Sequence, residues 1–295
     1  MKHGLRVMAL LMALLLPAAS ALALDSIPYE MAEAPYLPHE DCFLPDHGGY
    51  QDESLDIRVE TFRHLDTTVM AVYVTIADPS QLRTGTADPK RPLAQSTWAT
   101  TDRIAKRYNA VLAINGDWFS YNKNSKGVII RNGESIRKPV YASERDSLII
   151  DANGDLTIIP TTEEAFAAFE GEIIHSFWFG PGLVVDGVQI TEEEVQARRF
   201  SNLAEGGKTQ RMAIGQLGPL SYLILTCEGP ENAESKGLTV FEMAELCKEM
   251  GCVNAYNLDG GSSSTVALNG QKINALSSHK NRPVGDIIYF CTLVP

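Results

Sequence analysis

Long apolar stretches are missing from this sequence, and cysteine and histidine are scarce. After the first 23 residues, no segment approaches the roughly 18 uninterrupted apolar residues that a membrane-spanning helix needs. The six histidines stand singly, and Cys247 and Cys252 have neither zinc-site spacing nor a histidine nearby. No G-x-S-x-G segment marks a nucleophile elbow. We therefore expect no integral membrane span in the mature chain, no structural zinc site and no serine hydrolase of that type.

Basic residues are outnumbered by acidic ones. The chain has 25 Lys and Arg against 37 Asp and Glu, a formal net charge of −12. Nucleic-acid binding draws on clustered Lys and Arg, which release counterions from the phosphate backbone. The sequence therefore predicts no nucleic-acid partner, although one or two local cations can still hold a single anionic group.

The N-terminal residues 1–23 have the order of a secretory signal peptide. Lys2 and Arg6 precede an apolar run over 7–16, and small residues end at Ala23. We expect a mature chain that begins near Leu24 and is secreted, periplasmic or associated with the cell envelope. Five cysteines follow, and an odd number in an exported chain leaves at least one thiol unpaired or paired between molecules. Free buried thiols and a single bridge both stay open.

The rest of the chain divides into a short leading segment and one domain. Residues 24–55 carry several prolines without alternation, which predicts an extended arm or linker on the surface. Residues 56–295 are dominated by strand signals, joined in four places by Asn-Gly or Asp-Gly pairs typical of type I′ turns. Strands are expected at 67–76, 110–115, 127–130, 147–151, 156–160, 182–186, 211–217, 221–227 and 286–294.

Helical patterns are fewer than strand patterns. The strongest covers 238–251, where Thr239 is a candidate N-cap, Glu242 follows three residues later and Gly251 ends the pattern. Weaker patterns cover 96–109, 161–171 and 191–200. Because helices do not alternate regularly with strands, we predict an α+β fold, a single domain built on a mixed, largely antiparallel β-sheet with a few packed helices.

Three apolar strands run directly into polar residues and glycine, which suggests a common site. If these strands are neighbours pointing the same way, their ends bring three carboxylates and two amides to one rim. Paired carboxylates can divide into acid and base or nucleophile, as in glycoside hydrolysis, and clustered oxygens also suit a hard cation such as Ca²⁺ or Mg²⁺. The alternative is that they are ordinary strand-to-turn exits. The residues concerned are Asn115, Gly116 and Asp117; Glu228 and Gly229; and Asn257, Asp259, Gly260 and Gly261.

Several of these stretches together resemble the phosphodiester glycosidase family. The resemblance covers roughly residues 110–295, and its order and spacing are more specific than any one piece. It rests on "INGDWF" (114–119), "RMAIG" (211–215), the pair Glu228-Gly229, "GLTVFEMAELCKEMGCVNAYNLDGGSSSTVALNG" (237–270) and "RPVGDIIYF" (282–290).

The resemblance implies an exported hydrolase that cleaves the bond between the anomeric carbon of a sugar and a phosphate oxygen. Asp259 would be the essential carboxylate, with Glu228 and Asp117 as its partners, and a sugar-phosphate glycan, with an N-acetylglucosamine-like sugar open, would be the substrate. Arg211 and Arg282 would hold the phosphate, because a guanidinium matches phosphate oxygens bidentately. Substrate contacts would also come from Asn115, Gly116, Asn257, Gly260, Gly261, Ser262 and Ser263.

Two departures from the family pattern affect this interpretation. Ser262 stands where the family has the third glycine of an Asp-Gly-Gly-Gly-Ser run, and Glu228 stands where it usually has Asp. Two alternatives therefore stay open. One is a metal-assisted phosphodiesterase that breaks the P–O bond, with Ca²⁺ or Mg²⁺ as its cation, although no cofactor follows from the motifs themselves. The other is a glycan-binding relative without catalysis.

Overall fold

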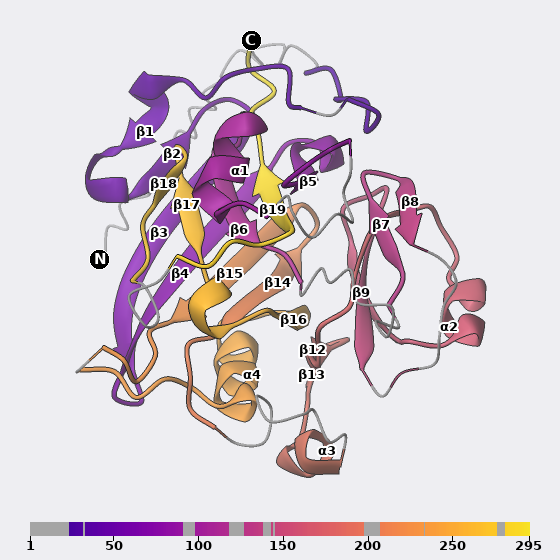
Figure 1. The fold of residues 1–295 in the computed structure, drawn as a ribbon, viewed down its shortest axis with the longest axis vertical. Coiled ribbons are helices and arrows are strands. Elements are labelled where there is room, and N and C mark those ends of the chain that lie inside the picture. Colours follow the sequence, from indigo (N-terminus) through magenta and orange to yellow (C-terminus); the bar gives the residue numbers. More distant parts are fainter. Residues whose placement is uncertain are drawn as a thin grey trace, which may run out of the picture.

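The structure is a computed structural model, and it describes residues 24–31, 33–90, 98–117, 127–137, 143, 145–197, 207–232, 234–275 and 281–295. The predicted signal peptide, Trp118 and Phe119 lie outside these residues. Within them the chain forms three β-sheets with a few short helices packed on their outer faces (Figure 1). Every strand pairing in this part of the chain is antiparallel, and the α+β single-domain fold is confirmed.

The large sheet has nine strands. In spatial order they are β1 (Phe43–Leu44), β2 (Gly49–Gln51), β3 (Leu55–His64), β4 (Thr67–Ile76), β15 (Ser221–Cys227), β14 (Met212–Gly218), β16 (Asn254–Leu258), β12 (Gly182–Val185) and β13 (Val188–Gln189).

Two five-stranded sheets accompany the large sheet. The central sheet runs β18 (Gln271–Lys272), β17 (Val266–Leu268), β6 (Leu112–Asn115), β19 (Asp286–Phe290) and β5 (Leu82–Thr86). The outer sheet runs β10 (Leu156–Pro160), β9 (Asp146–Asp151), β11 (Ile173–Phe177), β7 (Ile129–Arg131) and β8 (Glu134–Arg137).

The main hydrophobic core lies where the three sheets face one another. Alternating side chains contribute to it from each sheet, for example Ile214 from β14, Ile114 from β6 and Ile150 from β9, all buried. Because successive strand residues point to opposite faces, the other faces of two sheets need cover of their own. The helix α4 (Val240–Glu249) packs on the large sheet, and α1 (Thr101–Arg107) packs on the central sheet.

All four helical patterns form helices, although shorter than their patterns. Besides α1 and α4 these are α2 (Glu163–Ala168) and α3 (Glu192–Ala197). At α4 the predicted capping box is present: the Glu242 amide donates to Thr239 Oγ1 at 3.0 Å, and the Thr239 amide donates to Glu242 Oε2 at 2.8 Å. Thr239 and Glu242 therefore set the N-terminal end of α4, as their spacing in the sequence predicts.

Three of the four predicted turns have positive φ at both central residues, as type I′ requires; these are Asn132-Gly133, Asp186-Gly187 and Asn269-Gly270. The fourth, Asn153-Gly154, differs, because only Gly154 has positive φ. There the Asp151 carboxylate accepts hydrogen bonds from the amides of Asn153 and Asp155, and this side chain organises the turn instead.

Part of the segment predicted as an arm is built into the fold. β1 and β2 extend the large sheet, and Tyr50 is fully buried in the main core. Upstream, the buried Arg83 guanidinium donates to the carbonyls of Ile27, Pro28 and Met31 at 3.3, 3.2 and 2.8 Å. Prolines there prevent regular strand pairing, so a side chain supplies the hydrogen bonds that hold the backbone.

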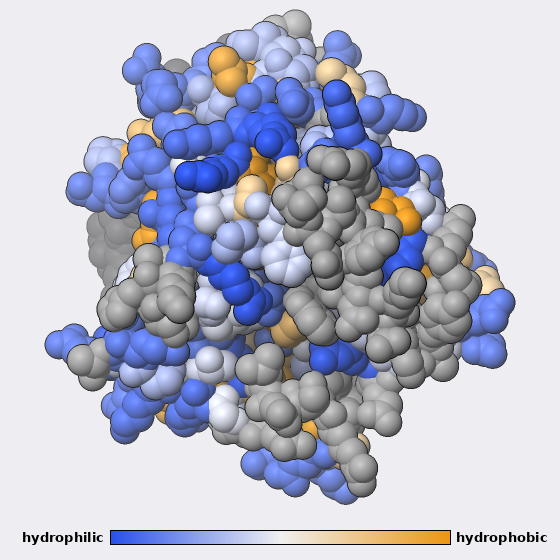
Figure 2. All heavy atoms as spheres, in the orientation of Figure 1, coloured by the Kyte–Doolittle hydropathy of each residue, from blue (hydrophilic) through white to orange (hydrophobic). Residues whose placement is uncertain are grey.

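The five cysteines are all free thiols, and four of them are buried. In the part of the chain that the structure describes, no helix is long and apolar enough to cross a membrane. Hydrophilic residues dominate the coloured surface in Figure 2, with small separate apolar areas. This distribution is expected because most apolar side chains are buried in the main core and beneath α4 and α1.

The capping box makes a quantitative prediction for α4. Thr239→Ala removes the acceptor for the Glu242 amide, so the free energy of unfolding should fall by about 1 kcal/mol in a urea titration. Thr239→Ser keeps the hydroxyl and should stay close to the unmutated protein. Equal losses in both variants would show that the methyl group, rather than the cap, contributes the stability.

Candidate active site

Three of the polar strand ends identified in the sequence lie at one edge of the fold. β15 and β16 both flank β14 and run antiparallel to it, so their C-terminal ends point the same way. β6 belongs to the central sheet, yet its end also reaches this edge. The side-chain Nδ2 of Asn115 donates to the Asp259 carbonyl at 2.8 Å, and its Oδ1 accepts from the Thr265 backbone amide at 3.1 Å.

Asp259 follows β16, and its carboxylate is nearly buried. Ser263 Oγ donates to Oδ2 at 2.6 Å, and the Arg282 guanidinium forms an ion pair with the same oxygen. The Arg282 side chain is 44% exposed, so this edge is open to solvent at the arginine. Burial raises the pKa of Asp259 above its ordinary value, Arg282 and Ser263 oppose that rise, and the nearby charge of Asp117 adds to it.

Asp117 lies deeper and is held at both oxygens. Oδ1 forms an ion pair with Arg131 at 3.3 Å, and Oδ2 accepts from the Trp178 backbone amide at 2.7 Å. Its side chain is 3% exposed. With both oxygens engaged, Asp117 is suited to shaping the local field and holding neighbouring backbone rather than to attacking a substrate itself.

Arg131 and Asp286 complete the charged cluster, and sequence reasoning missed both. Arg131 Nη2 lies 2.7 Å from Asp286 Oδ2, and Arg131 Nε donates to the same oxygen at 2.8 Å. Asp286 opens β19 and is fully buried. Burial raises its pKa to about 7, Arg131 opposes the rise, and the charges of Asp117 and Asp259 add to it.

Gly116 separates Asn115 from Asp117 at a position that has no room for a side chain. A Cβ there would stand 2.5 Å from Asp286 Oδ1. This oxygen is buried and has no hydrogen-bond partner among the residues that the structure describes. The absence of a side chain at Gly116 therefore lets the backbone after β6 lie directly against the buried carboxyl group of Asp286.

The loop after Asp259 is a tight turn whose first part packs on β14. A Cβ on Gly260 would stand 2.8 Å from the Gln210 carbonyl, and Gly261 has φ of 57°. Ser262 lies inside the 3₁₀ turn η5 (Gly261–Ser263) and is not among the residues with positive φ. A Cβ at position 262 therefore strains nothing. The Ser262 carbonyl accepts from the Arg282 amide at 3.3 Å.

Asn257 and Arg211 line up beside this loop with different partners. The side-chain Nδ2 of Asn257 donates to the Gly180 carbonyl at 2.8 Å, while the side-chain Oδ1 is buried and unpartnered within the described residues. The Arg211 guanidinium donates to the carbonyls of Leu238 and Gly207 at 2.8 and 2.9 Å, and burial lowers its pKa to about 10. The structure thus places Arg282, rather than Arg211, in contact with the Asp259 carboxylate.

Glu228 is separated from the other two predicted carboxylates by the start of β14. Its Oε2 accepts from Ser235 Oγ at 2.6 Å, and its amide donates to the Thr68 carbonyl at 2.9 Å. Its backbone is two strand spacings from Asp259, about 10 Å. The expected set of three carboxylates is therefore replaced by Asp117, Asp259 and Asp286.

Arg145 is a further cation that the sequence did not reveal. It lies over the rings of Trp178 and Phe179, and burial lowers its pKa, which the charges of Tyr256 and Asp259 only partly oppose. No local pattern marks Arg145 or Arg131. Asp286 did carry a signal, because it is an acidic residue at the start of an apolar strand within "RPVGDIIYF".

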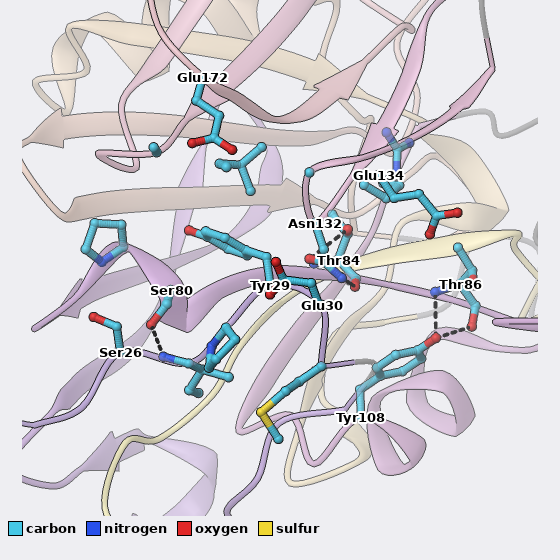
Figure 3. Close-up of a pocket in the computed structure, with 18 of the residues that line it drawn as sticks. Ser26, Tyr29, Glu30, Ser80, Thr84, Thr86, Tyr108, Asn132, Glu134 and Glu172 are labelled. Carbon is cyan, nitrogen blue, oxygen red and sulfur yellow. Dashed lines mark hydrogen bonds between the residues drawn. The ribbon is translucent and has the colours of Figure 1, made fainter.

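A cavity of about 880 Å³ lies beside this cluster. Figure 3 shows how it brings together Tyr29 and Glu30 of the N-terminal segment, Thr84 of β5, and Asn132 and Glu134 around the β7–β8 turn. Asp117, Asp259 and Asp286 do not line it, although Arg131 does. Within the described ranges no group of three or more His, Cys, Asp or Glu side chains could hold a metal ion.

Comparison with known proteins places this arrangement in a family. A family model described as phosphodiester glycosidase matches residues 108–291. An uncharacterized SPbeta prophage-derived protein, YomE, of Bacillus subtilis is 29% identical over 77% of this chain and 37% of its own length. N-acetylglucosamine-1-phosphodiester alpha-N-acetylglucosaminidase of Mus musculus is 24% identical over 86% of this chain and 52% of its own length. The chain thus spans about a third to a half of these relatives.

Solved structures share the fold. The catalytic domain of zebrafish N-acetylglucosamine-1-phosphodiester alpha-N-acetylglucosaminidase, auto-inhibited by its pro-peptide, superposes with a TM-score of 0.66 at 18% identity, covering 90% of this chain and 97% of that one. A hypothetical protein from Synechocystis superposes with a TM-score of 0.53 at 17% identity, covering 80% and 62%. At these identities the likeness concerns the fold alone.

The raised pKa of Asp286 predicts a specific pH dependence of stability. Between about pH 4 and pH 7 the folded state holds a proton that the unfolded state has released, so this group's contribution falls as pH rises through that window. The difference in unfolding free energy between the unmutated protein and Asp286→Asn should therefore decline by up to about 1.4 kcal/mol per pH unit. Urea titrations at several pH values measure it.

His175 makes that comparison of variants necessary. It is fully buried, burial lowers its pKa to about 3, and stability from this group therefore rises with pH up to about 6.5. The two groups have opposite slopes over the same range, and only the difference between the two proteins isolates Asp286. A difference that does not vary with pH would mean that Asp286 keeps its ordinary pKa in the folded state.

Proposed function

This chain belongs to the phosphodiester glycosidase family, and we propose that it hydrolyses the sugar C1–O bond of a sugar-1-phosphodiester. The observation that carries the proposal is the pairing of the nearly buried Asp259 carboxylate with the half-exposed Arg282 guanidinium. A substrate with a phosphate beside an anomeric carbon needs both an anion to face the developing oxocarbenium charge and a cation to face the phosphate.

Asp259 is the essential carboxylate in this proposal. A phosphate is already a good leaving group, so protonation of the leaving oxygen matters less than stabilising positive charge on the sugar ring and positioning water. Ser263 and Arg282 both bind Oδ2 of Asp259 and fix the orientation of the carboxylate plane. The negative charge of Asp117 lies close to Asp259 and adds to the negative electrostatic potential at its carboxylate.

Arg282 is the phosphate-binding residue. Its guanidinium is the partly exposed cation at Asp259, so it can exchange part of its contact with the carboxylate for phosphate oxygens. The Ser262 carbonyl holds the Arg282 backbone at 3.3 Å, which ties this arginine to the glycine and serine loop. An N-acetylglucosamine-like sugar would match the substrate in the names of the mammalian relatives, with Asn257 and the loop backbone as contacts. Asn115, whose polar atoms are engaged with backbone, would position the loop instead.

The substrate setting follows from the sequence rather than from the site. We propose an exported enzyme that acts on a sugar-phosphate glycan outside the cytoplasm, at the cell surface or in its surroundings. The signal-peptide pattern of residues 1–23 supports export, and the acidic composition supports a partner other than nucleic acid.

Asp259→Asn should reduce the release of free reducing sugar from N-acetylglucosamine-1-phosphate methyl diester by about a hundredfold or more. The substitution removes the charge and keeps the shape. Asp66→Asn makes the same chemical change at an exposed ion pair with Lys236 and should leave turnover unchanged. Equal release by the Asp259→Asn variant and the unmutated protein would remove Asp259 from the mechanism.

Hydrolysis in ¹⁸O-labelled water identifies the bond that breaks. C1–O cleavage places the label in the released sugar. Label in the phosphate would instead establish P–O cleavage, and loss of turnover in chelator would then favour the metal-assisted alternative. Sugar binding without any turnover by the unmutated protein would favour a glycan-binding relative.

Arg282→Gln should change the pH profile as well as substrate affinity. Arg282 lowers the pKa of Asp259, so its removal raises that pKa and moves the acidic limb of kcat/KM to higher pH. KM for the diester should rise at the same time, because a phosphate contact is lost. Arg282→Lys keeps the charge and should retain most of the unmutated pH profile. An unmoved acidic limb in the glutamine variant would separate this limb from Asp259.

A further inference from the structure

A second, smaller cavity of about 180 Å³ is lined by Gln210 but not by Asp259. One wall of the cavity runs from the exposed rim inward and is set by strand register: Thr61 of β3 pairs with Met70 of β4, which pairs in turn with the buried Thr226 of β15. Side chains opposite one another on neighbouring strands point to the same face. The chain after β18 lines the cavity at Ile273, Asn274 and Ala275.

Two buried polar atoms around this cavity have no partner. Thr226 Oγ1 and Gln210 Oε1 are both unsatisfied within the described part of the chain, and their residues are 2% and 1% exposed. The orientation of the Gln210 amide is fixed, because its Nε2 donates to the carbonyls of Ser264 and Ala275 at 3.5 and 3.1 Å. A buried polar atom without a partner costs stability, so its persistence suggests that something else binds there.

Glu228 contributes a third polar group to the same lining. One of its oxygens is held by Ser235 at 2.6 Å, which anchors the carboxylate at the edge of the cavity. Because Ser235 anchors the Glu228 carboxylate at this cavity, that carboxylate lies apart from Asp259. A carboxylate with an anchored oxygen can still accept hydrogen bonds through its remaining lone pairs.

The chemistry of the lining selects a class of ligand. Gln210 Oε1 and the Glu228 carboxylate are acceptors, so the ligand must bring donors. Neither lysine nor arginine is among the described residues that line the cavity, which disfavours a phosphate group there. Met70 and Ile273 add apolar surface of the kind that packs against sugar C–H groups. The volume equals about six water molecules at about 30 Å³ each, which suits a single small ring.

We propose that this cavity is a subsite for a neutral, hydroxyl-bearing group of monosaccharide size. The three acceptor positions at Gln210, Thr226 and Glu228 bind its hydroxyl groups. The choice of a sugar over another polyol rests on the proposed function, whereas the need for hydroxyl donors does not.

The subsite is linked to the Asp259 loop through Gln210. The side-chain amide of Gln210, a lining residue of the cavity, also donates to the Ser264 carbonyl, and Asn274 donates to that carbonyl at 3.0 Å. The Gln210 carbonyl in turn accepts from the Gly261 amide at 2.8 Å. A ligand in the cavity therefore contacts the residue that holds both ends of the glycine and serine loop.

A local reporter tests the subsite without depending on turnover. Methionine methyl groups labelled with ¹³C give one NMR signal each, and Met70→Leu assigns the signal of Met70. Titration with methyl α-D-glucopyranoside should shift the Met70 signal saturably and leave that of Met250, which packs on the other face of the large sheet, in place. Sodium phosphate should shift neither. The absence of a saturable shift at Met70 would overturn the proposal.

Matched variants identify the groups that bind. Thr226→Val and Glu228→Gln should each raise the Kd measured at Met70 about tenfold, because the first removes a hydroxyl and the second removes the charge and replaces one acceptor oxygen by a donor NH₂ group. Thr101→Val makes the same change as Thr226→Val at another buried, unpartnered hydroxyl, on α1, and should not alter the Kd. Thr61→Trp, at an exposed position on the rim, should block binding without disturbing the core.

An unchanged Kd in the Thr226, Glu228 and Thr61 variants would overturn the proposal. Failure of the subsite and failure of the proposed function give different results. Loss of sugar binding in these variants of a protein that releases no sugar from any diester supports the subsite and rejects the glycosidase. Turnover that depends on Asp259, with no shift of the Met70 signal, would support the glycosidase and reject the subsite.

Discussion

The ion pairs of Arg131 hold the site together. This guanidinium comes from β7 of the outer sheet and reaches two buried carboxylates at the exit of β6 and the start of β19, both in the central sheet. A buried carboxylate without a cation carries a large desolvation cost, so the outer sheet must dock in one place for both to stay paired. The docking of the outer sheet on the central sheet and the charge balance near Asp259 therefore depend on one side chain.

The edge that carries Asp259 combines these ion pairs with a loop held on two sides. Asn115 at the end of β6 holds the Asp259 carbonyl, while Gln210, just before β14, holds Gly261 through its backbone carbonyl and Ser264 through its side-chain amide. The Asn115 side chain suits this task because it offers the backbone both a donor and an acceptor. Preorganisation of this kind keeps the carboxylate oriented without adding another charge, which suits the oxocarbenium-like transition state of the proposed reaction.

Local features of the fold could be read from the sequence, whereas distant pairings could not. The Thr239 cap, the Asn132-Gly133 turn and the extent of β4 follow from neighbouring residues, and the structure reproduces them. Arg131 and Asp286 are 155 residues apart, and their ion pair depends on how two sheets dock. The family motifs named Asp259 and Arg282 because those positions lie within continuous matching stretches.

The two departures from the family motif have different structural consequences. Ser262 sits in a 3₁₀ turn with ordinary φ, so the loss of a glycine leaves the geometry around Asp259 intact. Glu228 stands beyond Gln210, where its extra methylene carries the carboxylate to Ser235 and to the rim of a separate cavity. A departure in the turn is therefore tolerated by the backbone, while a departure at the strand end changes which ligand atoms the protein can meet. In the proposed subsite, the residue at position 228 should accordingly affect which ligand binds more than it affects the reaction proposed at Asp259.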